Sequence, residues 1–271
     1  MNFDPLIDII NKPNTQPGDY TGPDGLLYCG KCHTAKQKRG SGTLSGKILH
    51  IMCRCQLEAQ EQEEREAKQK RIEELRARCL QLDNLRRHTF SGASDARHIQ
   101  IARRYVVEWS SMKESGSGLV FWGNTGSGKS FTTHCVANAL IDQGISVCYV
   151  TAAGLVSNLM DRDIPKQEYR DKLCRVPLLV VDDIGAERET SFAREQLCGV
   201  IDARLENGKP LIVTTNYSLT EMQETQDPAL SRLFDRVLGS CIPVRVVGES
   251  RRKVDGAARL AEARRLLLGD G

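Results

Sequence analysis

The spacing of apolar residues changes along the chain and divides it into three segments. Residues 29–55 have few apolar positions, and residues 57–88 contain neither glycine nor proline. From about residue 95 onward, short continuous apolar runs alternate with segments of helical apolar spacing. We therefore predict an N-terminal arm and small module over 1–56, a charged linker helix over 57–90 and an α/β domain over 91–271.

Four apolar runs in the last segment predict β-strands that are buried on both faces. Helical patterns lie between and before them, including residues 96–112 and 131–144. Buried strands that alternate with helices are typical of a parallel sheet with helices on both faces. The predicted strands are 119–122 (LVFW), 146–151 (SVCYVT), 178–182 (LLVVD) and 211–215 (LIVTT).

The linker segment is rich in charged residues that favour helices. Its thin apolar stripe favours a mostly solvated helix whose second half packs against another part of the chain. A bare charged spacer is the alternative, and composition does not choose between the two. The stripe consists of Ile72, Leu75, Cys79, Leu82 and Leu85. Residues 1–28, which contain four prolines, are expected to form a loose arm.

The segment GNTGSGKS reads G-x-x-x-x-G-K-S and lies between a predicted strand and a predicted helix. Its glycines let backbone N–H groups point into one concavity, and the helix N-terminus adds positive potential. In this spacing Lys129 reaches the outer phosphates of a nucleotide and the Ser130 hydroxyl ligates Mg²⁺. We predict ATP as the ligand, with a flexible glycine loop as the alternative. The loop residues are Gly123, Asn124, Thr125, Gly126, Ser127, Gly128, Lys129 and Ser130.

Two acidic residues follow the apolar part of one predicted strand, and an asparagine follows the next strand. Because parallel strands bring ligand sites to their carboxyl ends, we expect Asp182 and Asp183 beside the phosphate loop. Asp182 would hold the Mg²⁺ shell, Asp183 would polarise the attacking water, and Asn216 would orient that water against the γ-phosphate. Alternatively, the acids cap the next helix and Asn216 merely opens a turn.

Composition limits the cellular compartment and the kinds of partner that the protein can have. The chain has 271 residues, ten cysteines and a formal net charge of +3, so any nucleic-acid contact must come from local patches. It has no secretory signal pattern and no apolar run long enough to span a bilayer, so we expect a cytoplasmic protein with no membrane partner. Cysteines are reduced there, and scattered ones indicate packing. The scattered cysteines expected in the core are Cys135, Cys148, Cys174, Cys198 and Cys241.

Apart from Cys79 of the linker stripe, the remaining four cysteines form a cluster in the first segment, C-x₂-C followed after twenty residues by C-x-C. Four thiolates close a tetrahedral Zn²⁺ site, and a segment this poor in apolar residues needs metal to fold. The predicted zinc ligands are Cys29, Cys32, Cys53 and Cys55. Because the second pair is unusually tight, His33 and His50 remain possible substitutes, and unliganded thiols are the alternative. Nearby basic residues either meet phosphates or keep the module soluble: Lys31, Lys36, Lys38 and Arg39.

Four motifs in this order, GNTGSGKS, LLVVDDIG, VTTNYS and ALSRLFDRV, resemble the AAA+ ATPases of the DnaC/DnaI helicase-loader and IstB group. The resemblance spans roughly residues 90–255 and implies an AAA+ fold. It also implies an arginine finger in SRLFDR, with Arg236 as the better match and Arg232 as its neighbour. That arginine would act on ATP held by the next subunit, so it implies self-association. The stretch ESRRKVDG resembles the family's sensor 2, which makes Arg251 the fourth catalytic candidate after Asp183, Asn216 and Arg236.

Two departures from the family pattern matter. Many relatives have Asp-Glu at the position of Asp182 and Asp183, and the shorter side chain predicts slow turnover. The sequence also ends soon after the sensor 2 stretch, so we expect the lid domain to be absent or vestigial. Residues 152–175 lie where this group inserts a helix that contacts single-stranded DNA, although a solvated helix is the default. Its basic residues are Arg162, Lys166, Arg170 and Lys172.

The leading functional hypothesis is a helicase loader. The zinc module would bind a DnaB-type replicative helicase, as the family resemblance implies, and the ATPase would engage single-stranded DNA under ATP control. The first alternative is an IstB-like helper of DNA transposition that acts on duplex DNA with a transposase. The second is an adaptor that binds ATP with negligible turnover and works purely through protein interactions.

Overall fold

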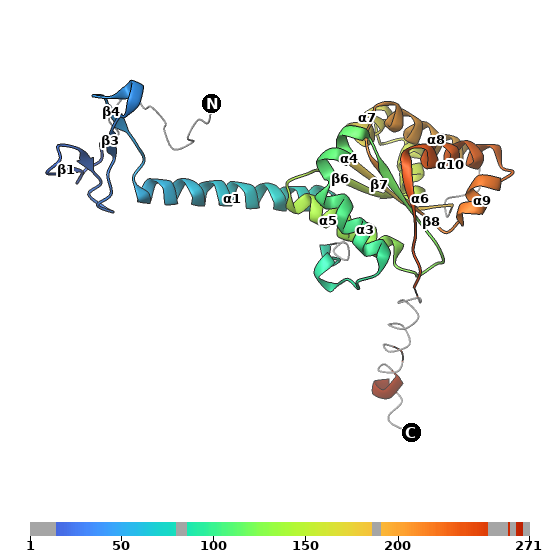
Figure 1. The fold of residues 1–271 in the computed structure, drawn as a ribbon. Helices are drawn as coiled ribbons and strands as arrows, with labels where there is room; N and C mark the ends of the chain where they lie inside the picture. The colour runs from blue at the N-terminus through green and yellow to red at the C-terminus, as the bar shows by residue number, and fades with distance from the viewer. Residues whose placement is uncertain (1–14, 80–85, 186–190, 249–259, 261–263, 268–271) are drawn as a thin grey trace. The chain divides into compact units, whose positions relative to one another are not determined.

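The computed structural model describes residues 15–79, 86–185, 191–248, 260 and 264–267. The chain forms two compact units, residues 1–70 and 71–271, and each is considered by itself (Figure 1). The three-part division at residues 56 and 90 remains a prediction. In the described part of the chain, no helix combines the length and the apolar composition needed to cross a membrane.

The first unit contains two small antiparallel sheets, β1 with β2 and β3 with β4. Its buried apolar side chains, among the described residues, are those of Cys29, Leu49 and Cys53. Two-stranded sheets with so little apolar burial are marginal in water, so this unit needs a further source of stability. The elements are β1 (Tyr20–Thr21), β2 (Leu27–Tyr28), β3 (Gln37–Arg39), a 3₁₀ turn (Gly42–Leu44) and β4 (Ile48–His50).

The expectation of a loose arm over residues 1–28 is wrong for its described C-terminal part. Residues 20–28 form the β1–β2 hairpin. The Asp19 carboxylate is buried, pairs with Lys36 Nζ at 2.6 Å and accepts a hydrogen bond from the backbone N–H of Gly30 at 3.1 Å. Lys36 is therefore committed to an internal ion pair, whereas Lys31 and Arg39 are exposed.

Helix α1 (Arg54–Cys79) covers most of the predicted linker segment. Residues 58–71 are exposed, but Ile72 and Leu75 are buried in the second unit. The prediction that the second half of the helix packs against another part of the chain is therefore confirmed at these two positions. The side chains of Cys79, Leu82 and Leu85 lie outside what the structure describes.

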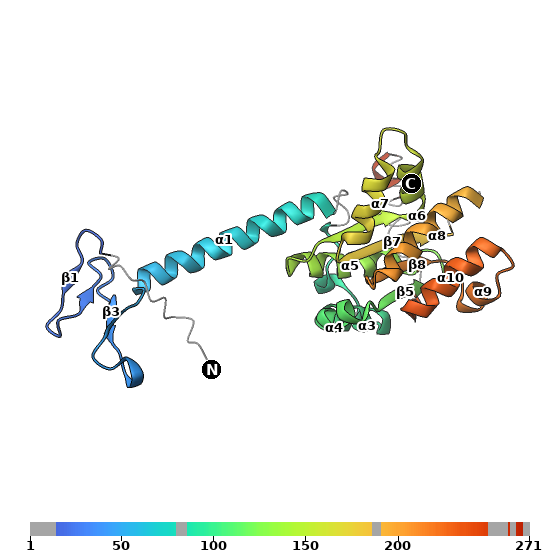
Figure 2. The ribbon, with the colours of Figure 1, turned by 90° about the horizontal axis from the view of Figure 1, so that it is seen from above.

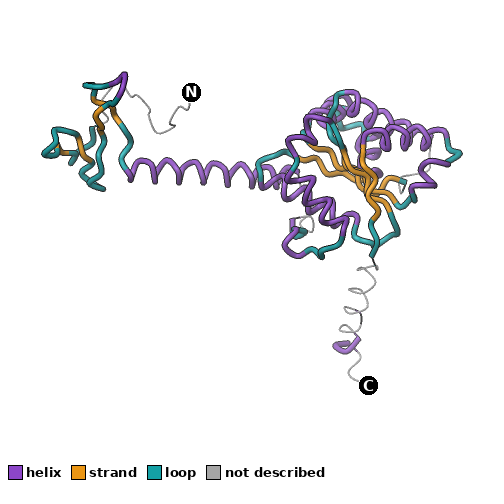
Figure 3. Tube along the Cα trace, in the orientation of Figure 1, coloured by secondary structure: helices purple, strands orange, loops and turns teal. Residues whose placement is uncertain are grey.

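The second unit is built on five parallel strands in the order β6-β7-β8-β5-β9. The strands are drawn in orange in Figure 3. Four of them fall on the predicted runs, whereas β9 was not predicted. Its sequence CIPVR contains a proline, which is compatible with the edge position that β9 occupies. The strands are β5 (Gly118–Trp122), β6 (Val147–Thr151), β7 (Leu178–Ile184), β8 (Leu211–Thr215) and β9 (Cys241–Arg245).

Helices cover both faces of the sheet (Figures 1 and 2). Alternate strand residues point to opposite faces, so Leu119 packs on the side of α3, α4 and α5, and Val120 packs on the side of α6, α7, α8 and α10. The α/β fold class is confirmed. The helices are α3 (Arg97–Val107), α4 (Trp109–Ser115), α5 (Lys129–Asp142), α6 (Ala152–Met160), α7 (Lys166–Arg175), α8 (Ser191–Glu206), α9 (Leu219–Glu224) and α10 (Pro228–Ser240).

The scattered cysteines separate into two groups. Cys135, Cys198 and Cys241 are buried, as predicted, but Cys148 and Cys174 are only partly buried. Cys148 lies on the edge strand β6, where one side of the strand has no neighbour in the described sheet. An edge position therefore explains its exposure.

Candidate nucleotide site and cysteine cluster

The segment between β5 and α5 forms a tight loop at the carboxyl edge of the sheet. Gly128 caps α5 with a φ of 104°, and Gly123 has a φ of 141°. A Cβ at Gly123 would lie 2.4 Å from the carbonyl oxygen of Val246, so a side chain does not fit there. Because Gly128 is the N-cap of α5, the loop ends at the N-terminus of a helix. Backbone N–H groups at this end of a helix favour the binding of anions.

The Lys129 side chain lies inside this loop and is only 6% exposed. Its Nζ donates hydrogen bonds to the carbonyl oxygens of Gly123 at 2.7 Å and Asn124 at 2.9 Å, and to Oδ1 of Asn216 at 2.7 Å. The Ser127 hydroxyl is also buried and has no hydrogen-bond partner within the described residues. A buried ammonium group and an unpaired buried hydroxyl in one loop fit an anionic ligand.

A β-bulge brings both acidic residues of β7 to the loop. The register of β7 against β8 shifts at this point, and Asp183 has a φ of 61°. Consecutive residues of a regular strand point to opposite faces, whereas a bulge re-aims one of them. Asp182 accepts hydrogen bonds from Ser130 Oγ at 3.1 Å and Thr214 Oγ1 at 2.5 Å. Its carboxylate and the Ser130 hydroxyl are oxygen donors of the kind that Mg²⁺ prefers.

Asn216 joins the two halves of the site. Its Oδ1 accepts from Lys129, and its Nδ2 donates to Oδ1 of Asp183 at 3.1 Å. The Asp183 backbone N–H in turn donates to Thr214 Oγ1 at 2.8 Å. Thr214 was missed by sequence reasoning, although the polar residues that end the apolar run LIVTT were a usable signal.

These groups line a cavity of about 350 Å³. Lys129, Ser130, Asp183 and Asn216 lie on its walls, so residues that are far apart in the sequence meet there. Three aromatic side chains also line it, and sequence reasoning had not assigned them to the site: His88, Phe131 and His134. The signal available for two of them was their position in the first turns of the helix after the loop.

The three rings form a connected group. Nδ1 of His88 lies 2.7 Å from Nδ1 of His134, and the two rings are stacked with centroids 5.0 Å apart. Phe131 packs against His88 at 5.0 Å, and Asn138 Nδ2 donates to the His88 carbonyl oxygen at 2.9 Å. Burial lowers the pKa of His134 to about 4 and also lowers the pKa of His88. Both imidazoles are therefore neutral at pH 7, and one donates an N–H to the other.

The predicted finger arginines lie on α10, outside this cavity. Both contact the same carboxylate, that of Asp202 on α8, with Arg232 Nη2 at 2.7 Å and Arg236 Nε at 3.4 Å. Their side chains are 66% and 54% exposed. They are thus separate from the nucleotide cavity of their own chain. Arg251 lies outside the described residues.

The stretch 152–175 forms α6 and α7. Arg162, Lys166 and Lys172 are exposed, whereas Arg170 is partly buried and donates to Gln196. Three of the four basic residues named from the sequence are therefore available to solvent.

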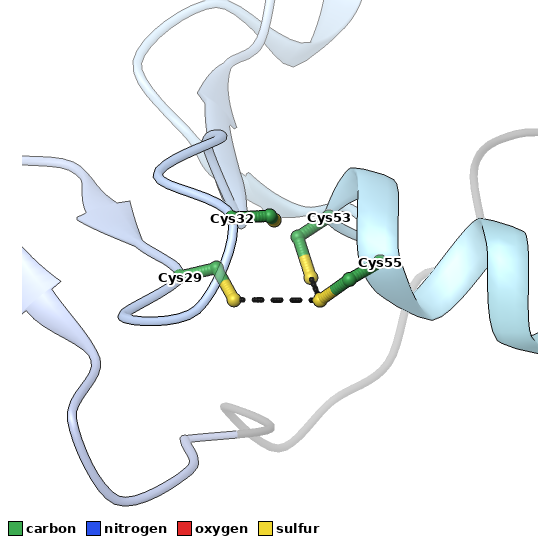
Figure 4. Close-up of side chains that lie close together, drawn as sticks. All are labelled: Cys29, Cys32, Cys53 and Cys55. Atoms are coloured by element: carbon green, nitrogen blue, oxygen red, sulfur yellow. Dashed lines mark hydrogen bonds between the residues drawn. The ribbon is translucent and has the colours of Figure 1, made fainter.

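In the first unit, the four predicted cysteines converge (Figure 4). All four Sγ atoms lie within 4.8 Å of one another, with 3.6 Å between Cys29 and Cys55 and 3.4 Å between Cys53 and Cys55. A tetrahedral zinc ion with Zn–S bonds of about 2.3 Å separates its sulfurs by roughly 3.8 Å, so this spacing is compatible with zinc. Within the described residues, neither histidine joins the group.

The first cysteine pair is arranged to favour thiolates. Backbone N–H groups of Cys32 and Lys31 lower the pKa of Cys29, and the Thr34 hydroxyl, at 3.0 Å, lowers the pKa of Cys32 to about 5. Thiolate, rather than thiol, is the form that ligates zinc. His33 directly follows the C-x₂-C pair with a φ of 56°, and its Nδ1 lies 3.3 Å from the Tyr20 hydroxyl.

Comparisons with known proteins agree with the ATPase geometry. The replicative helicase loader DnaI of Bacillus subtilis (strain 168) is 32% identical over 150 residues, which are 51% of this chain and 48% of that protein. The replicative helicase loader DnaC of Escherichia coli (strain K12) is 28% identical over 140 residues, 50% of this chain and 55% of that protein. The chain thus spans about half the length of the curated relatives it matches.

Solved structures match the fold. A crystal structure of DnaI matches with a TM-score of 0.53 at 23% identity, covering 63% of this chain and 94% of that one. A crystal structure of the DnaC helicase loader gives 0.52 at 24% identity, with coverages of 61% and 100%. The second unit therefore has the AAA+ fold. A family model described as IstB-like ATP binding protein matches residues 41–258, most of the chain, and the protein belongs to this family of ATP-binding P-loop proteins.

Proposed function

We propose that this chain is an ATP-dependent DNA replication protein that loads a DnaB-type replicative helicase onto single-stranded DNA. The observation that carries the proposal is the convergence of the phosphate loop with Asp182, Asp183 and Asn216 in a chain similar to two replicative helicase loaders. We assign different steps of this role to the predicted segments 1–56, 57–90 and 91–271 of the chain. Such a role is cytoplasmic.

In the ATPase, the loop from Gly123 to Ser130 would bind the phosphates of ATP. Lys129 would exchange one of its present acceptors for a phosphate oxygen, and Ser130 with Asp182 would hold Mg²⁺, which neutralises charge on the phosphates. Asp183 and Asn216, hydrogen-bonded to each other, would orient the attacking water. Because the Asp183 side chain is short and its oxygen is engaged by Asn216, we expect slow hydrolysis.

Hydrolysis also requires Arg236 of a second copy of the chain. Arg236 is exposed and lies outside the cavity of its own chain, as a residue that acts on a neighbour's nucleotide must. Arg236→Ala should keep ATP binding and lose hydrolysis by roughly 10³-fold or more. Mixing it with Lys129→Ala should restore activity where an intact finger meets an intact loop. A mixture that stays inactive while assembly is confirmed contradicts a shared site.

The first unit would bind one Zn²⁺ through Cys29, Cys32, Cys53 and Cys55, and the metal would supply its folding energy. We assign the contact with the helicase to this unit. It exposes Tyr20 and Ile48, at 43% and 50%, which are apolar contacts of the kind a protein partner buries. Single-stranded DNA is assigned to Arg162, Lys166 and Lys172, whose charges would neutralise phosphates.

Affinity capture tests the partner directly. The full chain, loaded with zinc and ATP, should retain a DnaB-type helicase, and Cys53→Ser should lose it while keeping ATP binding. The second candidate, a transposition helper, is favoured by the IstB-like description of the family model. It predicts retention of a transposase and preference for duplex DNA. Retention of the transposase and not the helicase would replace the first proposal with the second.

A further inference from the structure

The two exposed arginines of α10 converge on one acidic side chain. Asp202 on α8 is 13% exposed, and each of its carboxylate oxygens takes one arginine, Oδ2 that of Arg232 and Oδ1 that of Arg236. Exposed ion pairs add little stability, so two arginines on one half-buried carboxylate are not explained by folding alone. The group has two positive charges and one negative, which leaves it a net cation.

The way in which the carboxylate holds each arginine differs. It accepts a hydrogen bond from Nη2 of Arg232 at 2.7 Å, whereas its contact with Arg236 is an ion pair with Nε at 3.4 Å. A guanidinium held at Nε keeps both terminal nitrogens for two parallel bonds to a phosphate, the geometry in which arginine binds anions best. Arg232 neutralises the same carboxylate, so Asp202 does not cancel the charge that Arg236 presents.

Two glycines beside the cluster leave space on the surface of α8 and α10 for a second molecule. Gly199 precedes Asp202 by three residues on α8, and Gly239 follows Arg236 by three residues on α10, so each lies on the same face as its neighbour in the cluster. A Cβ added at either glycine would meet no atom of the described chain within 4 Å. Glycine lowers helix stability relative to alanine in the interior of α8, where Gly199 lies, whereas Gly239 is the next-to-last residue of α10. Packing within the described chain requires neither glycine. A second molecule that approaches this face would account for both.

We propose that Asp202 is a positioning residue that fixes Arg236, with Arg232 as counter-charge, for contact with the triphosphate bound by a second copy of this chain. An arginine side chain loses rotamer freedom when it meets its target, and a carboxylate that already restrains it reduces this loss. The inference rests on the proposed shared ATP site. It adds Asp202 and the carboxylate's contact with Nε, which the finger assignment alone does not contain.

The test compares Asp202→Asn with Arg236→Ala and with a matched control, Arg194→Gln. Arg194 on α8 forms an ion pair with Asp227, the N-cap of α10, and lies in neither site. Asp202→Asn should bind ATP normally and hydrolyse it roughly 10- to 100-fold more slowly. Asp202→Glu should recover part of the rate, and Arg194→Gln should hydrolyse at the wild-type rate. Tryptophan fluorescence confirms folding of each variant, since Trp109 and Trp122 both lie in the ATPase unit.

Mixing experiments distinguish positioning from a general structural role. Asp202→Asn should regain activity with Lys129→Ala, which supplies an intact finger, but not with Arg236→Ala, which supplies none. Wild-type hydrolysis by Asp202→Asn, or no rescue by Lys129→Ala when that variant rescues Arg236→Ala, overturns the inference. If Arg236→Ala itself hydrolyses ATP normally, the shared-site proposal fails instead, so the two failures are distinguishable.

Discussion

Asn216 is the residue through which the two halves of the nucleotide site communicate. One amide group accepts from Lys129 of the loop and donates to Asp183 of β7, at 2.7 and 3.1 Å. A phosphate that draws Lys129 away removes one of these bonds, and the amide can then follow Asp183 and water instead. In the proposed mechanism, ATP binding and the orientation of the attacking water would thereby be linked through this single side chain.

Lys129→Ala should abolish ATP binding and leave the fold intact. The substitution removes the charge directed at the phosphates, and the contacts it loses are to loop carbonyls and Asn216 rather than to the apolar core. Titration with ATP, followed by the fluorescence of Trp122 next to the loop, measures the loss. Lys113→Ala, which removes an exposed lysine of α4, is the matched control and should bind normally. Wild-type affinity in Lys129→Ala would refute the phosphate-loop assignment.

His88→Ala should weaken ATP binding by roughly tenfold, because the ring lines the cavity and offers a stacking surface to a base. Inorganic tripolyphosphate has no base, so its affinity should stay unchanged. His88→Phe should retain most ATP affinity because it keeps a stacking ring.

The control is Thr89→Ala, which changes the neighbouring exposed residue outside the cavity. An equal loss for ATP and tripolyphosphate would show that His88 shapes the loop rather than contacting the base.

Acidification should destabilise the ATPase unit through His134. Burial lowers its pKa to about 4 in the folded state, against about 6.5 when unfolded. The free energy of unfolding is therefore at its full value above pH 6.5 and decreases as the pH falls toward 4. In this range His134 is protonated in the unfolded chain but stays neutral in the folded chain. The expected loss at pH 5.5 is on the order of 1 kcal/mol.

Urea unfolding followed by tryptophan fluorescence at pH 7.5 and 5.5 measures this loss, because both tryptophans report on the ATPase unit alone. His134→Gln should be less stable at pH 7.5 but should change less with pH. An unchanged dependence on pH in that variant would assign the effect to other groups.

At the level of elements, the apolar pattern predicted most of the sheet and its helices. The four predicted strands are continuous apolar runs, a pattern that predicts strands buried on both faces, and helices cover both faces of the sheet. The predicted helix 96–112 is two helices, α3 and α4, separated at Glu108, whose ψ of 18° departs from the helical value. Strand β9 was missed because its apolar run is short and contains Pro243, and an edge strand tolerates that proline.

The candidate site was predictable where its residues lie close together in the sequence. The loop and the acidic pair are local sequence motifs, and the spacing of the cysteine pairs indicates a metal site. The bulge at Asp183, the Asn216 bridge, His88 in the cavity and Asp202 beneath the arginines depend on contacts between distant segments. No local pattern encodes these contacts.

Loss of one zinc ligand should unfold the first unit and leave the ATPase unit unaffected. Cys53→Ser removes a buried ligand from a unit with almost no apolar core, whereas the second unit has its own sheet and helices. Metal analysis should fall from one zinc per chain to none, and limited proteolysis should cut within residues 15–55. The urea transition seen by tryptophan fluorescence should not move.

Cys174→Ser, outside the cluster, is the matched control and should keep its zinc. Full resistance to proteolysis in Cys53→Ser protein without zinc would mean that the unit folds without metal.

At the scale of the whole molecule, different parts of one chain are proposed to bind different partners. The zinc unit is proposed for the helicase, the cavity for ATP, and the Asp202 cluster for a second copy. Under this proposal the ATP site would be complete only in an assembly, so nucleotide turnover should depend on assembly. The exposed arginines on α10, held outside their own cavity, are the structural reason for this expectation.

The most direct test is reconstituted loading. A DnaB-type helicase is mixed with circular single-stranded DNA, ATP and the full chain, and the helicase that remains on the DNA after gel filtration is quantified. The proposed loading role predicts that the wild-type chain increases the bound helicase severalfold, and that Lys129→Ala and Cys53→Ser each abolish the increase, whereas Lys113→Ala and Cys174→Ser do not. Equal amounts of bound helicase with and without the wild-type chain, when the two proteins are shown to associate, would contradict it.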